Sequence, residues 1–302
     1  MSEQVRIKAP VVETIEIQKL KPGVPVGGKL LGRLLVEQGK LVDDDIEKVV
    51  RYARKKRLRF GEAAVKLRLI SSRDLEHAMA TQFDYPFLEK GDGGYAKELV
   101  AAFKPFSRKG QAVRNLCSQL LLRWYREGEN SLAIVGSHER EGRSYIAANM
   151  AIVFSQLGYK TLLVDGDLQH ARQHKLFRVK NTSGLSAVLI GRTTPDLVVK
   201  KLPVFRNLSI MPAGAQPPNP VELMGRQELP ALMAELRSQY EVVIVDTPSL
   251  VLRTGAEMLA KACKHALVVA RKNKTLVSDA QALTDALQQT GANIVGTTLT
   301  DF

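Results

Sequence analysis

The sequence predicts an α/β protein with a doubly wound, mainly parallel sheet, preceded by a small helical domain. Two observations carry this prediction. Over the second part of the chain, short runs that are apolar at nearly every position alternate with helical segments, which is typical of strands buried on both faces. Before them, a helical pattern occurs twice, in copies that begin at Leu31 and Phe60.

The chain of 302 residues is long enough for two domains. We expect a mobile tail over residues 1–28, a helical repeat domain over 29–90, a linker over 91–103 and an α/β domain over 104–302. The tail is polar and interrupted by prolines and glycines, and a glycine-rich run at 90–94 opens the linker.

The composition limits the cellular setting and the partners. Two cysteines, Cys117 and Cys263, make no disulfide framework, and no apolar run approaches the ~20 residues of a membrane span. We therefore expect a cytoplasmic protein. The net charge of +13 is compatible with anionic ligands, but no aromatic residue interrupts the basic run 54–59, so nucleic acid is a disfavoured partner.

Each copy of the repeat predicts a short helix, a turn and a longer amphipathic helix. The segment 31–36 corresponds to 60–65, with a glycine second in both. Asp43 and Ser71 are expected to cap the longer helices, because their side chains accept hydrogen bonds from backbone N–H groups.

This repeat resembles the N-terminal MshEN domain of type II secretion and type IV pilus assembly ATPases. In that family the tandem copies can bind cyclic di-GMP, and the resemblance assigns Arg59, Gly61 and Gln82 of the second copy to such a site. In the first copy, Leu30 and Ala53 stand where the family has arginine and glutamine. Cyclic di-GMP binding and a protein-docking role both remain open.

The second domain is expected to contain a parallel sheet that binds its ligand beyond the carboxyl ends of the strands. The apolar runs that predict its strands are residues 132–135, 161–164, 208–211, 242–245, 267–269 and 294–299.

The segment Gly136–Ser144 is nearly a Walker A motif, the phosphate-binding P-loop. It fits G-x-x-x-x-G-K-[ST] at every fixed position except the lysine, which is Arg143, and it lies between a predicted strand and a predicted helix. Arginine is bulkier than lysine and permanently charged, so the exchange is not conservative. The residues expected to bind ATP are Gly136, Glu141, Gly142, Arg143, Ser144 and Tyr145.

Acidic residues follow two of the predicted strands. Asp165 and Asp167 come after the second strand, and Asp246 ends another, as in a Walker B motif. Each could be a helix cap, but together with Ser144 they form the oxygen-rich ligand set that Mg²⁺ prefers. We expect Ser144, Asp165 and Asp246 to hold Mg²⁺, and Asp165, Asp167 and Arg143 to be the catalytic candidates.

The region from Lys104 to Phe302 resembles the bacterial tyrosine kinases (BY-kinases) of polysaccharide chain-length determinants, specifically the EpsG-like type of exopolysaccharide operons. Besides the Walker elements, the resemblance rests on residues 184–191 and on the proline-rich run 211–223. It implies a P-loop fold, ATP with Mg²⁺ and activation of a tyrosine hydroxyl by Asp165. It also implies a membrane polysaccharide-export partner, a place at the inner membrane through that partner, and homo-oligomers.

Departures from the family pattern accumulate around the predicted site. They are Arg143 for lysine, Gln169 for arginine, Ser249 for proline, Gly255 for aspartate and Thr300 for asparagine. No tyrosine follows Tyr240, so the tyrosine cluster of the family has no counterpart.

Three functions are compatible with these residues. The first is an active kinase that phosphorylates a tyrosine of a partner. The second, which the accumulated departures favour, is a degenerate kinase that regulates or docks onto the polysaccharide machinery. The third is a positioning ATPase of the ParA/MinD kind, which shares this P-loop architecture.

Overall fold

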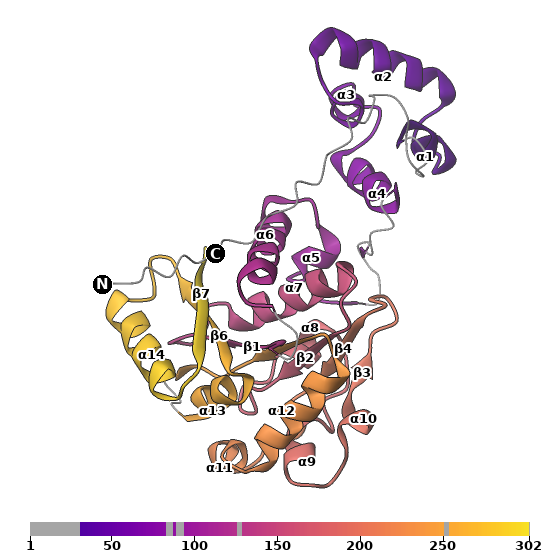
Figure 1. Ribbon diagram of the computed structural model, residues 1–302. Coiled ribbons are helices and arrows are strands. Elements are labelled where there is room, and N and C mark those ends of the chain that lie inside the picture. The colour runs from indigo at the N-terminus through magenta and orange to yellow at the C-terminus, as the bar shows by residue number, and fades with distance from the viewer. Residues whose placement is uncertain (1–30, 83–86, 89–93, 126–128, 251–253, 302) are drawn as a thin grey trace, which may run out of the picture. The chain divides into compact units, whose positions relative to one another are not determined.

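The computed structural model describes residues 31–82, 87–88, 94–125, 129–250 and 254–301 (Figure 1). The predicted tail, Leu30 and the start of the predicted linker lie outside these ranges. The chain divides into two compact units, Met1–Ala78 and Met79–Phe302.

The first unit contains the predicted helical repeat. Its short helices are α1 (Leu31–Glu37) and α3 (Phe60–Lys66), and its longer helices are α2 (Asp43–Lys56) and α4 (Ser72–Gln82), which crosses the boundary between the units. Leu35, in α1, is fully buried in a small apolar core shared by both copies.

The glycine of each copy is explained by the packing of a short helix against a longer one. A Cβ on Gly61 would lie 2.4 Å from Leu75, and a Cβ on Gly32 would lie 3.5 Å from Ile46 and 3.2 Å from Phe60. Ile46 and Leu75 occupy corresponding places in the two copies, so the repeat extends to its helix packing.

The predicted caps differ in outcome. Ser71 caps α4: its hydroxyl accepts from the Asp74 backbone N–H (3.1 Å), and its own N–H donates to the Asp74 carboxylate (3.0 Å). The prediction for Asp43 was wrong. Val42 holds the cap position of α2 without a side-chain bond, and Asp43 is the first helical residue, where its charge favours the helix dipole.

The second unit is built on a seven-stranded sheet in the order β3-β4-β2-β5-β1-β6-β7. All neighbouring strands are parallel except β3 and β4, which are antiparallel. The strands are β1 (Ser131–Val135), β2 (Thr161–Asp165), β3 (Lys200–Lys201), β4 (Leu208–Met211), β5 (Val242–Asp246), β6 (His265–Arg271) and β7 (Asn293–Thr300). The six predicted strands are confirmed; the short exposed β3 was not predicted.

Helices cover both faces of this sheet (Figure 1). On one face lie α5 (Val100–Phe103), α6 (Arg108–Arg123) and α7 (Arg143–Gln156). The other face is covered by α9 (Leu185–Leu189), α11 (Pro220–Met224), α12 (Glu228–Gln239), α13 (Thr254–Cys263) and α14 (Val277–Gln289). Two further short helices are α8 (Gln173–Leu176) and α10 (Pro195–Val198).

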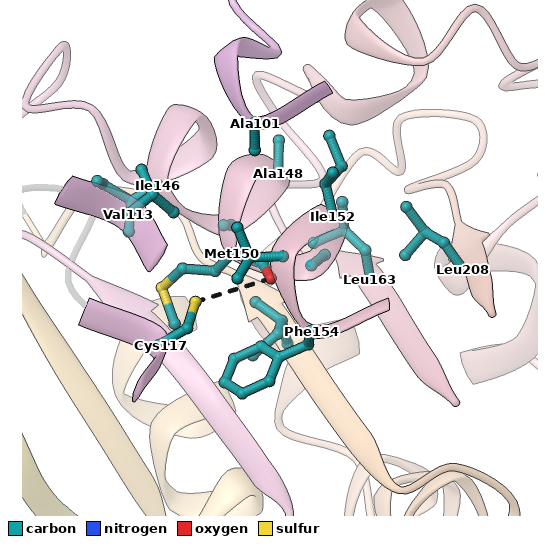
Figure 2. Close-up of a cluster of buried hydrophobic side chains, with 14 of the residues drawn as sticks. Ala101, Val113, Cys117, Ile146, Ala148, Met150, Ile152, Phe154, Leu163 and Leu208 are labelled. Atoms are coloured by element: carbon teal, nitrogen blue, oxygen red, sulfur yellow. Dashed lines mark hydrogen bonds between the residues drawn. The ribbon is translucent and has the colours of Figure 1, made fainter. Parts of the chain in front are cut away.

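The core has two halves because side chains alternate across the buried strands. Leu132 and Ile134 of β1 belong to the half under α7, whereas Ala133 and Val135 belong to the other. Figure 2 shows the first half, in which Cys117 of α6 packs beside α7.

Residues 94–103, which were expected to belong to a linker, pack into the second unit. Asn149 of α7 fastens them: its side-chain oxygen accepts from the Ala101 N–H (2.8 Å), and its amide donates to the Glu98 carbonyl (3.0 Å). Across the described residues, no helix is both long and apolar enough to cross a bilayer.

Candidate nucleotide site

The P-loop segment lies where the sequence predicted it, between the end of β1 and the start of α7. Gly142 caps α7 in the left-handed conformation (φ 99°) that glycine adopts without strain. Gly136 leaves room for its neighbours, because a Cβ there would lie 2.6 Å from the Glu141 carboxylate and 3.1 Å from the Arg143 guanidinium.

Glu141 supports the loop from inside. Its fully buried carboxylate accepts from the His138 N–H (3.0 Å) and the Thr275 hydroxyl (2.6 Å). The hydroxyl of Thr300 donates to the Glu141 carbonyl (2.6 Å). Thr300, a departure from the family pattern, therefore ties the end of β7 to the loop.

Arg143 is turned towards the protein. It is buried, with Nε donating to the Thr247 carbonyl (3.1 Å), Nη1 donating to the His138 carbonyl, and Nη1 lying 3.8 Å from the Glu141 carboxylate. The guanidinium thus joins the loop to the end of β5.

The loop still offers donors to an anion. Within the described parts of the chain, the backbone N–H groups of residues 139–144 donate to no protein acceptor. Such N–H groups at a helix N-terminus bind phosphate, and the helix dipole favours the negative charge.

The acidic strand ends meet beside this loop. Asp165 and Asp246 are register partners at the ends of β2 and β5, and both are fully buried. Each has one oxygen (Oδ1) without a hydrogen-bond partner. The second oxygen of Asp165 accepts from the N–H groups of Arg172 and Gln173 (3.0 and 2.8 Å), so this carboxylate also caps α8.

The pKa values of the pair reflect this crowding. Burial raises the pKa of Asp165 well above its usual value, and the Asp246 carboxylate raises it further. Burial also raises the pKa of Asp246, to about 6, although hydrogen bonds from Gln173 and Ser144 oppose the rise. Two buried carboxylates so close together have a strong preference for a bound cation or proton.

Asp167 has a different local role. Its carboxylate accepts from the N–H groups of Gln169 (3.2 Å) and His170 (2.8 Å), so it shapes the turn after β2. The helix-capping role that the sequence allowed for these aspartates belongs to Asp165 and not to Asp167.

Gln173 is a site residue that the sequence did not single out. Its buried amide nitrogen donates to the Asp246 carboxylate (2.8 Å) and to the Ser144 carbonyl (3.1 Å), and its own side-chain oxygen has no partner. Its spacing from Asp165 resembles no motif, so only the fold reveals this contact.

The residues present fit a Mg²⁺ ion. Unpartnered oxygens of Asp165 and Asp246 and the Ser144 hydroxyl, which lies within hydrogen-bond reach of Asp246, form an all-oxygen set beside the phosphate-binding N–H groups. Mg²⁺ held there would neutralise phosphate charge.

The remaining predicted site residues are Tyr145 and the three residues expected to bind cyclic di-GMP. Tyr145 follows the loop and lines a cavity of about 150 Å³ with Lys109 and Thr300. Of the expected cyclic di-GMP residues, Arg59 is exposed before α3 and Gly61 packs against Leu75, both in the first unit, whereas Gln82, at the end of α4, belongs to the second.

No family model matches the chain, but individual proteins do. It is 32% identical over 196 residues to the CapB tyrosine-protein kinase of Staphylococcus aureus, covering 65% of this chain and 86% of that protein. It is 28% identical to the tyrosine-protein kinase YwqD of Bacillus subtilis, covering 66% and 84%. With the tyrosine-protein kinase Etk of Escherichia coli K12 it shares 30% identity over 66% of this chain but only 27% of Etk.

Solved structures of bacterial tyrosine kinases are also similar to this chain. The kinase domain of Escherichia coli ETK is 29% identical with a TM-score of 0.65, covering 67% of this chain and 79% of that one. The chimerical protein CapA2B2 is 28% identical with a TM-score of 0.63, covering 75% and 98%. MinD of Pyrococcus horikoshii, solved with Mg-ADP, shares the fold at 24% identity and a TM-score of 0.50, covering 56% and 69%. With its Walker loop, paired aspartates and sheet order, the chain belongs to the family of bacterial tyrosine-protein kinases.

Proposed function

We propose that this chain binds a magnesium–nucleotide complex at residues 136–144 and regulates exopolysaccharide synthesis or export, with little phosphoryl transfer of its own. The observation that carries the proposal is the combination of free loop N–H groups with unpartnered oxygens on Asp165 and Asp246. This combination provides acceptors for the metal and donors for the phosphates, which supports nucleotide binding.

The low rate of phosphoryl transfer in this proposal follows from the contacts of Arg143. A loop lysine reaches the β- and γ-phosphates, whereas the Arg143 guanidinium donates to the carbonyls of Thr247 and His138. It would have to exchange these bonds for bonds to phosphate, so less of its charge is available to stabilise the transition state.

The test separates binding from transfer. Calorimetry with a non-hydrolysable ATP analogue should show saturable, Mg²⁺-dependent binding, while labelled ATP should give little phosphotyrosine on a tyrosine-containing peptide. Arg143→Lys should raise the transfer rate by at least ~10-fold.

Two results would count against the proposal. Absence of Mg²⁺-dependent binding would remove the nucleotide role. Rapid transfer by the unaltered chain, abolished by Asp165→Asn, would establish the active-kinase alternative.

The proposed setting is the cytoplasm beside the inner membrane, with a membrane polysaccharide-export protein as partner and self-association as a homo-oligomer. Support comes from the relatives: one, from Klebsiella pneumoniae, is named for the cps region, and this chain spans only 29% of it. The positioning-ATPase alternative is supported only by the fold that this chain shares with MinD.

For the first unit, cyclic di-GMP is a second candidate ligand, alongside protein docking. It is supported by Arg59 and the neighbouring run 54–57, all exposed. Saturable binding below ~100 μM, or about −5.5 kcal/mol, that weakens in Arg59→Ala would support it; otherwise docking is the better proposal.

A further inference from the structure

Two cavities lie on either side of residues 214–216, beyond the carboxyl ends of β2 and β4. One, of about 540 Å³, begins at Leu168, directly after Asp167. The other, of about 510 Å³, extends towards Arg226. Both are lined by Ala215 and Gln216, and we call these two neighbouring cavities together the loop groove.

The wall of the loop groove is fixed by hydrogen bonds. Asn181 accepts from the Gly214 N–H (2.8 Å) and donates to the Gly214 carbonyl (3.0 Å), and the Ser186 hydroxyl donates to the Ala215 carbonyl (2.8 Å). A Cβ on Gly184 would lie only 2.0 Å from the Pro212 carbonyl oxygen. The two motifs most distinctive in the sequence, residues 184–191 and 211–223, therefore build this wall.

The charge of the loop groove is positive. The positively charged side chains along it are Arg172, Lys175, Arg192 and Arg226, and His170 and His174 also line it. The carboxylate that lines it, Glu222, accepts from the Asn219 amide.

Three of these cations are available to a ligand. Lys175, Arg192 and Arg226 are exposed, and none has an ion-pair partner among the described residues. By contrast, Arg172 lies 3.5 Å from Glu98, and His170 lies 4.0 Å from Glu139.

Apolar side chains lie between these cations. Ile190, Pro217, Pro218 and Leu223 line the groove, whereas no phenylalanine, tyrosine or tryptophan in the described part of the chain does. A groove for single-stranded nucleic acid uses aromatic side chains on which bases stack, so this lining disfavours nucleic acid.

We propose that the loop groove binds an acidic, extended peptide segment of a partner protein. Arginine forks match carboxylates in geometry and charge, and the apolar lining accommodates the side chains between them. Pro217 and Pro218 have no N–H, so the rim cannot add a peptide as a full β-strand and recognition is through side chains. Peptide binding does not require phosphoryl transfer.

The experiment measures fluorescence anisotropy of a labelled peptide of glutamates around one tyrosine, with a lysine-for-glutamate peptide as its counterpart. The full chain should bind the acidic peptide saturably and the basic peptide weakly. Arg192→Glu and Arg226→Glu should each lower the affinity at least ~10-fold, since each loses a charge-assisted bond and adds repulsion. Arg123→Glu, at an exposed position at the end of α6, is the control for one charge reversal and should change the affinity for the acidic peptide little.

The exchanged side chains are exposed, so each variant should fold, and a thermal melt of each variant checks this. If Arg123→Glu lowered the affinity for the acidic peptide as much as Arg192→Glu or Arg226→Glu, the binding would depend on net charge alone. That result would overturn the proposal. So would an anionic polysaccharide or single-stranded DNA that binds more tightly than the peptide with the same dependence on Arg192 and Arg226. Specific protection of residues 214–226 from hydrogen exchange by the acidic peptide would support it.

Discussion

At the residue scale, Arg143 and Gln173 hold the candidate site together through internal contacts. Arg143 joins the P-loop to Thr247, and Gln173 joins Ser144 to Asp246, so both side chains connect the start of α7 with the end of β5. These contacts connect the loop and the strand end through protein groups alone. Under the proposed function, Arg143 must give up its bonds to the Thr247 and His138 carbonyls before it can reach a phosphate.

Gln173 should contribute to the stability of the metal-free protein. Gln173→Leu keeps the volume but leaves buried acceptors on Asp246 and Ser144 without this donor, which should lower the free energy of unfolding by about 1–3 kcal/mol. Urea unfolding in a chelator measures it. Gln169→Leu is the matched control, since the Gln169 side chain makes no described hydrogen bond; equal effects in the two variants would contradict this role.

Asp74 should make the first unit sensitive to acid. The Ser71 hydroxyl, and then Lys40, lower the pKa of Asp74 from 3.8 to about 2. A folded-state pKa below the unfolded value gives stability that is present above 3.8 and is lost as the pH falls through about 2. Circular dichroism should show helix loss in that window. Asp74→Asn should remove the pH dependence there; an unchanged acid transition would contradict the assignment.

At the element scale, the repeat makes a matched pair of glycines. Gly61→Ala places a Cβ 2.4 Å from Leu75, whereas Gly32→Ala places one 3.2 Å from the end of the Phe60 ring. The first change should destabilise the first unit by about 1–3 kcal/mol and the second by less, because Phe60 needs to shift only slightly. Thermal unfolding of both variants tests the order, and a larger loss in Gly32→Ala would refute it.

Elements were predictable where one physical signal dominates. The buried strands have apolar residues on both faces, and the α7 segment follows a glycine-rich turn, so both could be found from the sequence. The two-residue strand β3 consists of exposed lysines paired at the edge of the sheet, and nothing in its composition distinguishes it from a loop. The cap of α2 was missed because Asp43 follows a hydrophobic residue that takes the cap position.

The residues of the site could be predicted from the sequence, but their hydrogen bonds could not. The strand ends place Asp165 and Asp246 together, which parallel topology alone dictates. The inward turn of Arg143 depends on carbonyls of His138 and of Thr247, which is distant in sequence, and the contact of Gln173 depends on the path of the chain after β2. Such long-range pairings have no periodic signature.

At the scale of the whole molecule, two compact units with separate cores should unfold separately. Calorimetry should show two transitions, because the core around Leu35 and the sheet core have no apolar cluster in common. A bound magnesium–nucleotide complex should raise the transition temperature of the second unit only, because a ligand that binds the folded state stabilises it. A single transition that shifts as a whole would show that the units unfold as one.

The pairing of Asn149 with Ala101 and Glu98 has a mechanical implication. Asn149 lies on the helix that starts at the phosphate loop and also donates to the Tyr145 carbonyl (2.9 Å), one turn earlier. Under the proposed function, any sliding or rotation of α7 on nucleotide binding would therefore also displace residues 98–101, which these hydrogen bonds tie to it.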